Sequence, residues 1–101
     1  MTGRRVRFTV TARQQIDLEH RWWLEHRDHR QLFEDALGTA LNVLALLPGL
    51  GTPYELSPVP EVRRLYLDKV ACHLYYTYDD EQVIIRSMWG ATRGRSPSFG
   101  S

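Results

Sequence analysis

The sequence predicts an α+β domain of two layers, in which a helix hairpin packs on a four-stranded antiparallel sheet in the order β-α-α-β-β-β. Three observations predict it: an alternating apolar pattern near the N-terminus, two amphipathic helical stretches, and three β-rich runs separated by short turns. With 101 residues and 43% hydrophobic content, the chain supports one such core. We therefore expect a single domain over residues 1–92 and a loose, basic Gly/Ser-rich tail over residues 93–101.

The N-terminal half predicts a strand followed by two helices. Residues 5–10 (RVRFTV) alternate basic or polar with apolar side chains, as a half-buried strand does. Thr11 offers a hydroxyl N-cap for a helix running to about Arg27. Asp28 caps a second helix with a wide apolar stripe, which stops at Pro48-Gly49. Two helices joined by so few residues form an antiparallel hairpin.

The C-terminal half predicts a loop and a three-stranded meander. Residues 50–60 contain three prolines and predict a loop. Strands are expected over residues 61–67, 72–78 and 82–89, with turns at Asp68-Lys69 and at residues 79–81 (DDE). The first strand must join this meander to bury its apolar face.

Charge is unevenly distributed along a chain whose net charge is only +1. Residues 1–13 carry four arginines and no acid, and residues 82–101 carry three arginines and no acid. Residues 14–61 carry eight acids against three arginines. Basic ends that meet in space would form one positive face, suited to planar contacts with phosphate or carboxylate.

Cysteine and hydropathy exclude several classes of protein. The single cysteine, Cys72, excludes an intramolecular disulfide framework and zinc sites of the paired-cysteine type. The histidines show no metal-ligand spacing, so we expect neither a metal nor another cofactor. No apolar run reaches 18 residues and no signal peptide is visible, so we expect a cytoplasmic protein with no membrane partner.

The order and spacing of short motifs resemble the RelE/ParE superfamily of toxins from type II toxin–antitoxin pairs. The resemblance runs over about ninety residues and rests on four segments of this sequence: RVRFTVTA, LALLPGLGTPYE, EVRRLYL and HLYYTYDDEQVIIRSMWGATRGR. It implies an antitoxin partner and one of two activities. RelE-like members cut messenger RNA on the ribosome, whereas ParE-like members inhibit DNA gyrase.

The positions of the RelE-like nuclease residues are only partly kept. The resemblance puts the paired bases of the second strand at Arg64 and Tyr66, the next arginine at His73 and a later one at Arg93, with the terminal tyrosine near Phe99. One base is therefore missing, and Phe99 cannot exchange a proton. If the chain is a nuclease, Arg64, His73 and Arg93 would carry the reaction, with His73 titrating near neutral pH. Otherwise no catalytic residue is expected.

Two sets of binding residues are predicted. A target-binding surface is expected to contain Arg63, Arg64, His73, Tyr75, Arg86, Arg93 and Arg95. Antitoxin is expected to contact the adjacent pair Trp22 and Trp23, since tryptophan is enriched in interface hot spots. Purely structural roles are equally open at this point: His73 as a hydrogen-bonded strand residue, the tyrosines as packing residues, and Arg63 as the partner of a nearby acid.

The favoured hypothesis is a ParE-like toxin that acts on DNA gyrase. It would be neutralised by an acidic, partly disordered antitoxin that folds over the helix hairpin and the sheet edge. The first alternative is a RelE-like, ribosome-dependent and metal-independent endoribonuclease. The second is a non-catalytic binding module that represses its own operon together with the antitoxin.

Overall fold

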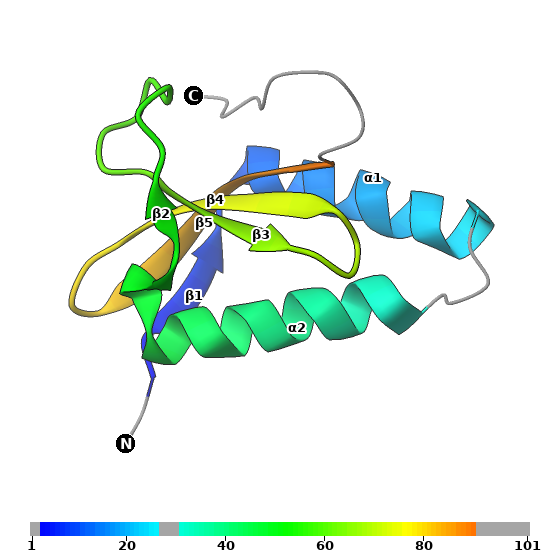
Figure 1. Ribbon diagram of the computed structural model, residues 1–101, viewed down its shortest axis with the longest axis horizontal. Coiled ribbons are helices and arrows are strands. Elements are labelled where there is room, and N and C mark those ends of the chain that lie inside the picture. The colour runs from blue at the N-terminus through cyan, green and yellow to red at the C-terminus, as the bar shows by residue number, and fades with distance from the viewer. Residues whose placement is uncertain (1–2, 27–30, 91–101) are drawn as a thin grey trace.

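The protein has two helices and five strands in one α+β domain (Figure 1). The structure is a computed structural model that describes residues 3–26 and 31–90. The predicted domain boundary at residue 92 and the predicted tail over residues 93–101 lie outside this range. In chain order the elements are β1 (Arg5–Phe8), α1 (Val10–His26), α2 (Gln31–Leu46), the short 3₁₀ helix η1 (Pro48–Leu50), β2 (Thr52–Pro53), β3 (Arg63–Leu67), β4 (Cys72–Tyr78) and β5 (Gln82–Gly90).

The prediction of a four-stranded antiparallel sheet is wrong in two respects, although the α+β class is confirmed. The sheet has five strands in the order β1-β5-β4-β3-β2, and β1 pairs with β5 in parallel. The parallel pairing places Val6 beside Val83 and Phe8 beside Ile85, so β1 buries its apolar side chains against the strand that is last in sequence. The additional strand β2 is two residues long and lies at the edge, where its proline is tolerated.

Helix α1 begins two residues earlier than the sequence predicts, because Thr9 rather than Thr11 is the capping residue. The Thr9 hydroxyl accepts a hydrogen bond from the Ala12 amide (3.1 Å) and lies 3.2 Å from the Arg86 carbonyl, to which it donates. The Thr9 amide in turn donates to the Ile85 carbonyl (3.0 Å). These bonds end β1 at Phe8 and fix the start of α1 against β5.

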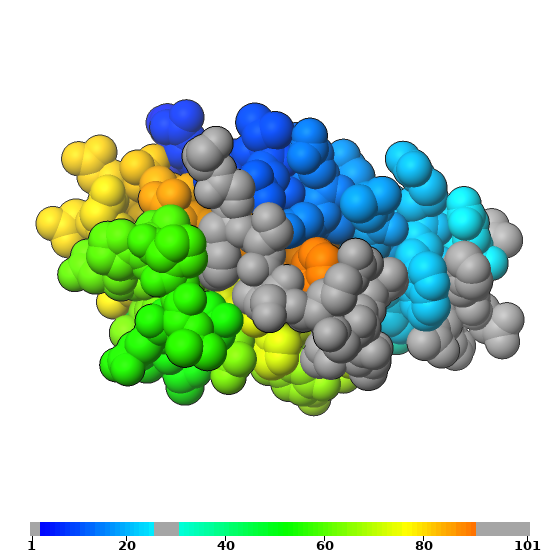
Figure 2. All heavy atoms as spheres, turned by 90° about the horizontal axis from the view of Figure 1, so that it is seen from above, coloured from blue at the N-terminus to red at the C-terminus, as the bar shows by residue number. Residues whose placement is uncertain are grey.

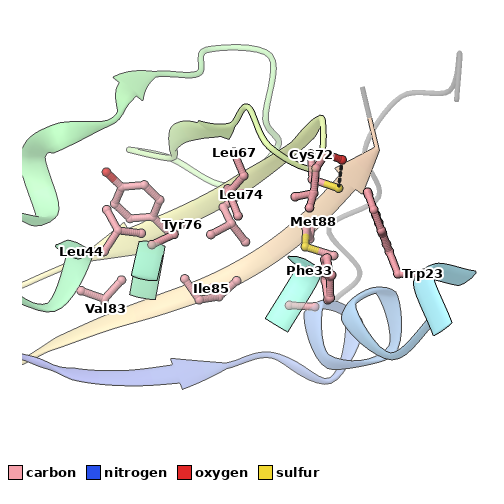
Figure 3. Close-up of a cluster of buried hydrophobic side chains, with 13 residues drawn as sticks. Trp23, Phe33, Leu44, Leu67, Cys72, Leu74, Tyr76, Val83, Ile85 and Met88 are labelled. Carbon is pink, nitrogen blue, oxygen red and sulfur yellow. Dashed lines mark hydrogen bonds between the residues drawn. The ribbon is translucent and has the colours of Figure 1, made fainter. Parts of the chain in front are cut away.

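A single core lies between the helices and one face of the sheet (Figure 3). Helix α2 contributes Phe33 and Leu44, and α1 contributes Trp23. The sheet contributes alternate residues of its central strands: Leu67, Cys72, Leu74, Tyr76, Val83, Ile85 and Met88. This period-2 burial leaves the intervening residues of β3 and β4 on the opposite face.

Helix and sheet are also joined by hydrogen bonds around η1. The buried hydroxyl of Tyr76 donates to the Pro48 carbonyl (2.6 Å) and accepts from the Gly51 amide (2.9 Å). The Arg63 guanidinium donates to the carbonyls of Gly51 (3.0 Å) and Gly49 (3.1 Å). In Figure 2 the segment that follows (green) lies beside the β4–β5 turn (yellow), where Pro53 and Asp79 line a common hollow. The segment predicted as a plain loop is therefore anchored at its start.

Neither helix within residues 3–26 and 31–90 has the length and apolarity that crossing a membrane would require.

Candidate target-binding site

The face of the sheet turned away from the helices, called the open face below, gathers arginine and aromatic side chains. On β3 and β4 the pairs Leu65–Leu74 and Leu67–Cys72 point toward the helices. The alternate pairs, Arg64–Tyr75 and Tyr66–His73, therefore point to the open face. The sequence prediction that Arg64, His73 and Tyr75 share a surface agrees with this placement.

These four residues and Tyr54 form an arginine–aromatic cluster. The Arg64 guanidinium carbon lies 5.4 Å from the centre of the Tyr54 ring, within cation–π range. Tyr54 meets Tyr75 edge to face at 4.8 Å, and His73 lies 4.9 Å from Tyr66 and 6.1 Å from Tyr75. Tyr66 is half exposed, whereas Tyr75 is almost fully buried beneath its neighbours. The cluster is thus a packed surface with one positive charge.

His73 is neutral in this setting because the protein disfavours its charged form. Burial lowers the pKa of His73 below its ordinary value, and the nearby Arg64 charge lowers it further. Its Nδ1 atom is buried without a hydrogen-bond partner among the described residues. A neutral imidazole beside a guanidinium can accept a proton or a hydrogen bond from a bound molecule.

Tyr75 is a poor proton donor in the same cluster. Burial raises the pKa of its hydroxyl, and this exceeds the opposing effect of a hydrogen bond from Arg64. Within the described cluster, His73 is therefore the only group that exchanges protons near neutral pH. The chemistry of the cluster favours binding through charge, stacking and apolar contact over a complete acid–base reaction.

Arg63 and Arg86, also predicted to bind the target, occupy different environments. Arg63 lies on the helix-facing side of β3, opposite Tyr76, and its guanidinium is held by the two glycine carbonyls described above. Arg86 occupies the β-bulge of β5 and donates from Nε to the Thr77 hydroxyl (2.8 Å) on the open face. Arg93 and Arg95, as well as Phe99, lie outside the described residues.

The two tryptophans predicted to contact antitoxin are not equivalent. Trp23 is 7% exposed, belongs to the core and donates from its indole to the Glu19 carboxylate (3.2 Å). Trp22 is half-buried, packs against the core cluster and meets Trp23 edge to face at 5.7 Å. Only Trp22 thus has surface to offer a partner.

The sequence interpretation missed Tyr54 and gave Tyr66 no binding role. Tyr54 follows Pro53 in a segment without alternation, so its position over Arg64 and Tyr75 depends on the β2–β3 pairing. Tyr66 was identified only as a lost base, although its place opposite His73 follows from the hairpin register. Within residues 3–26 and 31–90, no three His, Cys, Asp or Glu side chains converge in a way that could hold a metal ion.

A helix pair on one face of a β1-β5-β4-β3 sheet, with arginine and aromatic groups on the other, matches the fold expected of the RelE/ParE superfamily. No known family matches the sequence, and no curated protein matches it either. Among solved structures, a chain from the "Chromosomal ParDE TA system from P. aeruginosa" is similar, with a TM-score of 0.60 and 17% sequence identity. The match covers 81% of this chain and 89% of that chain. The resemblance to the superfamily is therefore confirmed as a likeness of fold.

Proposed function

We propose that the protein is the toxin of a type II toxin–antitoxin pair, that it acts in the cytoplasm, and that it inhibits DNA gyrase in the manner of ParE. The fold likeness to a chain of a ParDE system carries this proposal. Its open face supports the choice of a binding mode, because Arg64, Tyr66 and Tyr75 are residue types enriched in interface hot spots.

The exposure of the cluster fits a macromolecular target. Tyr66 is 50% exposed and lies beside the partly buried His73 ring, so a partner can cover both rings at once. Arg64 keeps a guanidinium next to them for a carboxylate or phosphate of the target. Arg86, and Arg93 and Arg95 as predicted from the sequence, would extend the same positive surface.

A supercoiling assay tests the choice of target. The purified full chain should inhibit gyrase-catalysed supercoiling at about micromolar concentration, and Arg64→Ala should require at least about tenfold more protein. Arg21→Ala is the matched control, because it removes an exposed arginine from α1 and leaves the cluster intact. Uninhibited supercoiling would reject gyrase as the target.

The antitoxin is the second part of the proposal. Strong expression of the chain alone should arrest growth, and co-expression of an adjacent gene for a small protein should restore it. Trp22 is the proposed contact on the helix pair, so Trp22→Ala should weaken rescue with little loss of toxicity. Normal growth on strong expression without antitoxin would favour the alternative of a non-catalytic co-repressor module.

A second candidate function, ribosome-dependent cleavage of messenger RNA, is favoured by one observation. His73 is a neutral base with an unpartnered Nδ1, and Arg64 lies near enough to lower its pKa. If the protein is such a nuclease, translating ribosomes incubated with it should yield cleaved transcripts, and His73→Ala should abolish cleavage. Intact transcripts would leave the binding mode as the better account.

A further inference from the structure

A groove runs between α2 and the outer edge of β3, on the other side of the sheet from the arginine–aromatic cluster. Its volume is about 310 Å³. The floor is apolar and is formed by Leu32, Ala36 and Ala40 of α2 together with Leu65 and Leu67 of β3. In Figure 1, α2 passes beneath β3 at this place.

The edge of β3 beside the groove is unpaired over part of its length. Strand β2 pairs only with Arg63 and Arg64. The Val62 carbonyl accepts a hydrogen bond from the Tyr54 amide (2.8 Å), so Val62, and by alternation Arg64 and Tyr66, direct their backbone groups toward this edge. The residue in register with Tyr66 would be Leu50, which belongs to η1 instead. Among the described strands, none pairs with the Tyr66 amide and carbonyl at this edge.

The rim of the groove is more acidic than basic. Asp35 on α2 and Asp68 after β3 are exposed at the rim, and Lys69 is the one basic residue lining it. This charge balance is opposite to that of the open face, where Arg64 supplies a positive charge. A basic ligand therefore complements the groove, and an acidic one complements the open face.

We propose that the groove binds an extended segment of a partner protein that carries apolar side chains flanked by lysine or arginine. The segment pairs through its backbone with Tyr66, as an added strand of the sheet. An apolar side chain enters the groove over Ala36, and a basic side chain meets Asp35 or Asp68. This inference rests on the proposed function in one respect, since the antitoxin would supply the segment. It revises the expected antitoxin, because a wholly acidic segment would not suit this groove.

Synthetic peptides test the proposal without an identified antitoxin. One peptide of about nine residues alternates leucine or valine with threonine and has lysines near both ends, and its matched control replaces the lysines with glutamate. Each is titrated into the ¹⁵N-labelled full chain by NMR. We expect the lysine peptide to bind at least about tenfold more tightly, with shifts concentrated at residues 65–69 and 32–40. Shifts elsewhere, equal binding of the two peptides or no binding at millimolar concentration would overturn the proposal.

Two pairs of variants separate backbone pairing from filling of the groove. Tyr66→Pro removes the edge amide and Tyr66→Ala keeps it, so only the proline variant should lose at least about tenfold in affinity if strand addition occurs. Thr39→Arg fills the groove from an exposed position on α2, whereas Thr39→Ser does not. Binding that survives in Thr39→Arg overturns the proposal even if Tyr66→Pro fails to fold.

Charge reversal gives a readout that a merely structural effect would not reproduce. Asp35→Lys with Asp68→Lys should make the glutamate peptide the tighter ligand, whereas Asp17→Lys on α1 should leave the preference for lysine unchanged. These outcomes do not depend on toxicity. A chain that fails to arrest growth but binds the lysine peptide refutes the proposed function alone, and a toxic chain that ignores both peptides refutes only this inference.

Discussion

Arg63 and Arg64 are neighbours in sequence but lie on opposite faces of β3. Arg63 pairs in register with the buried Tyr76 and binds the carbonyls of Gly49 and Gly51. Arg64 pairs with Tyr75 and lies over the Tyr54 ring. The strand period of two therefore separates a structural arginine from one available for binding, a distinction that their shared residue type conceals.

Truncation of the two arginines should separate stability from activity. Arg63→Ala should lower the free energy of unfolding by about 1–2 kcal/mol, because two charged hydrogen bonds to backbone carbonyls are lost. Arg64→Ala should cost less than about 1 kcal/mol, the value of one partly exposed cation–π contact, while weakening target inhibition. Urea denaturation of both variants measures the difference, and equal losses would contradict the assigned roles.

The Tyr76 hydroxyl should be worth more to stability than the hydroxyl of any exposed tyrosine. Tyr76→Phe leaves the Gly51 amide and the Pro48 carbonyl without their partner in a buried site, so we expect a loss of about 2 kcal/mol. The matched control, Tyr78→Phe, alters a ring that is 41% exposed and should change stability by less than about 0.5 kcal/mol. The urea midpoint should fall for the first variant alone, with the slope unchanged in both.

Local patterns predicted most of the elements because each depends on its own residues. The run CHLYYTY predicts β4 over residues 72–78, which are its observed bounds, and Pro48-Gly49 ends the helical stripe as expected. The position of β1 in the sheet could not be predicted in this way. Its neighbour depends on which strand offers an apolar face at the right height, and Val83 and Ile85 lie more than seventy residues away.

The candidate site was predictable where it follows a hairpin register and hidden where it depends on loop geometry. Arg64, His73 and Tyr75 lie on two strands joined by a short turn, so their common face follows from alternation. The opposite placement of Arg63 follows from the same rule, although the sequence interpretation grouped it with Arg64. Tyr54 reaches the cluster only because Arg63 and Tyr76 fix the preceding turn, and no local pattern encodes that contact.

Two glycines should respond to alanine in opposite directions. A Cβ atom at Gly51 would lie 2.7 Å from both the Arg64 carbonyl oxygen and the Tyr76 hydroxyl, so Gly51→Ala should destabilise the fold by about 2–3 kcal/mol. A Cβ atom at Gly38, inside α2, would meet no atom within 4 Å. Gly38→Ala should therefore stabilise the protein by about 0.5–1 kcal/mol through helix propensity. Thermal melts of the two variants should move to opposite sides of the wild-type midpoint.

Acidification should destabilise the protein through His73 well before the carboxylates are protonated. The pKa of His73 in the folded state lies below its ordinary value of 6.5, so the unfolded chain binds more protons as the pH falls through that value. This contribution to stability is complete above pH 6.5 and is lost progressively below it. Thermal midpoints measured from about pH 7.5 to 5.5 should fall, and His73→Gln should reduce the slope.

Asp79→Asn is the control for this pH dependence, because Asp79 titrates in a different range. Hydrogen bonds from the Glu81 and Gln82 amides hold the pKa of the Asp79 carboxyl below its ordinary value of 3.8. A carboxyl of this kind stabilises the fold above that pH and loses its contribution only as the pH falls through the lowered pKa. Asp79→Asn should therefore leave the slope between about pH 7.5 and 5.5 unchanged. An equal reduction of the slope in both variants would show that His73 is not the group responsible.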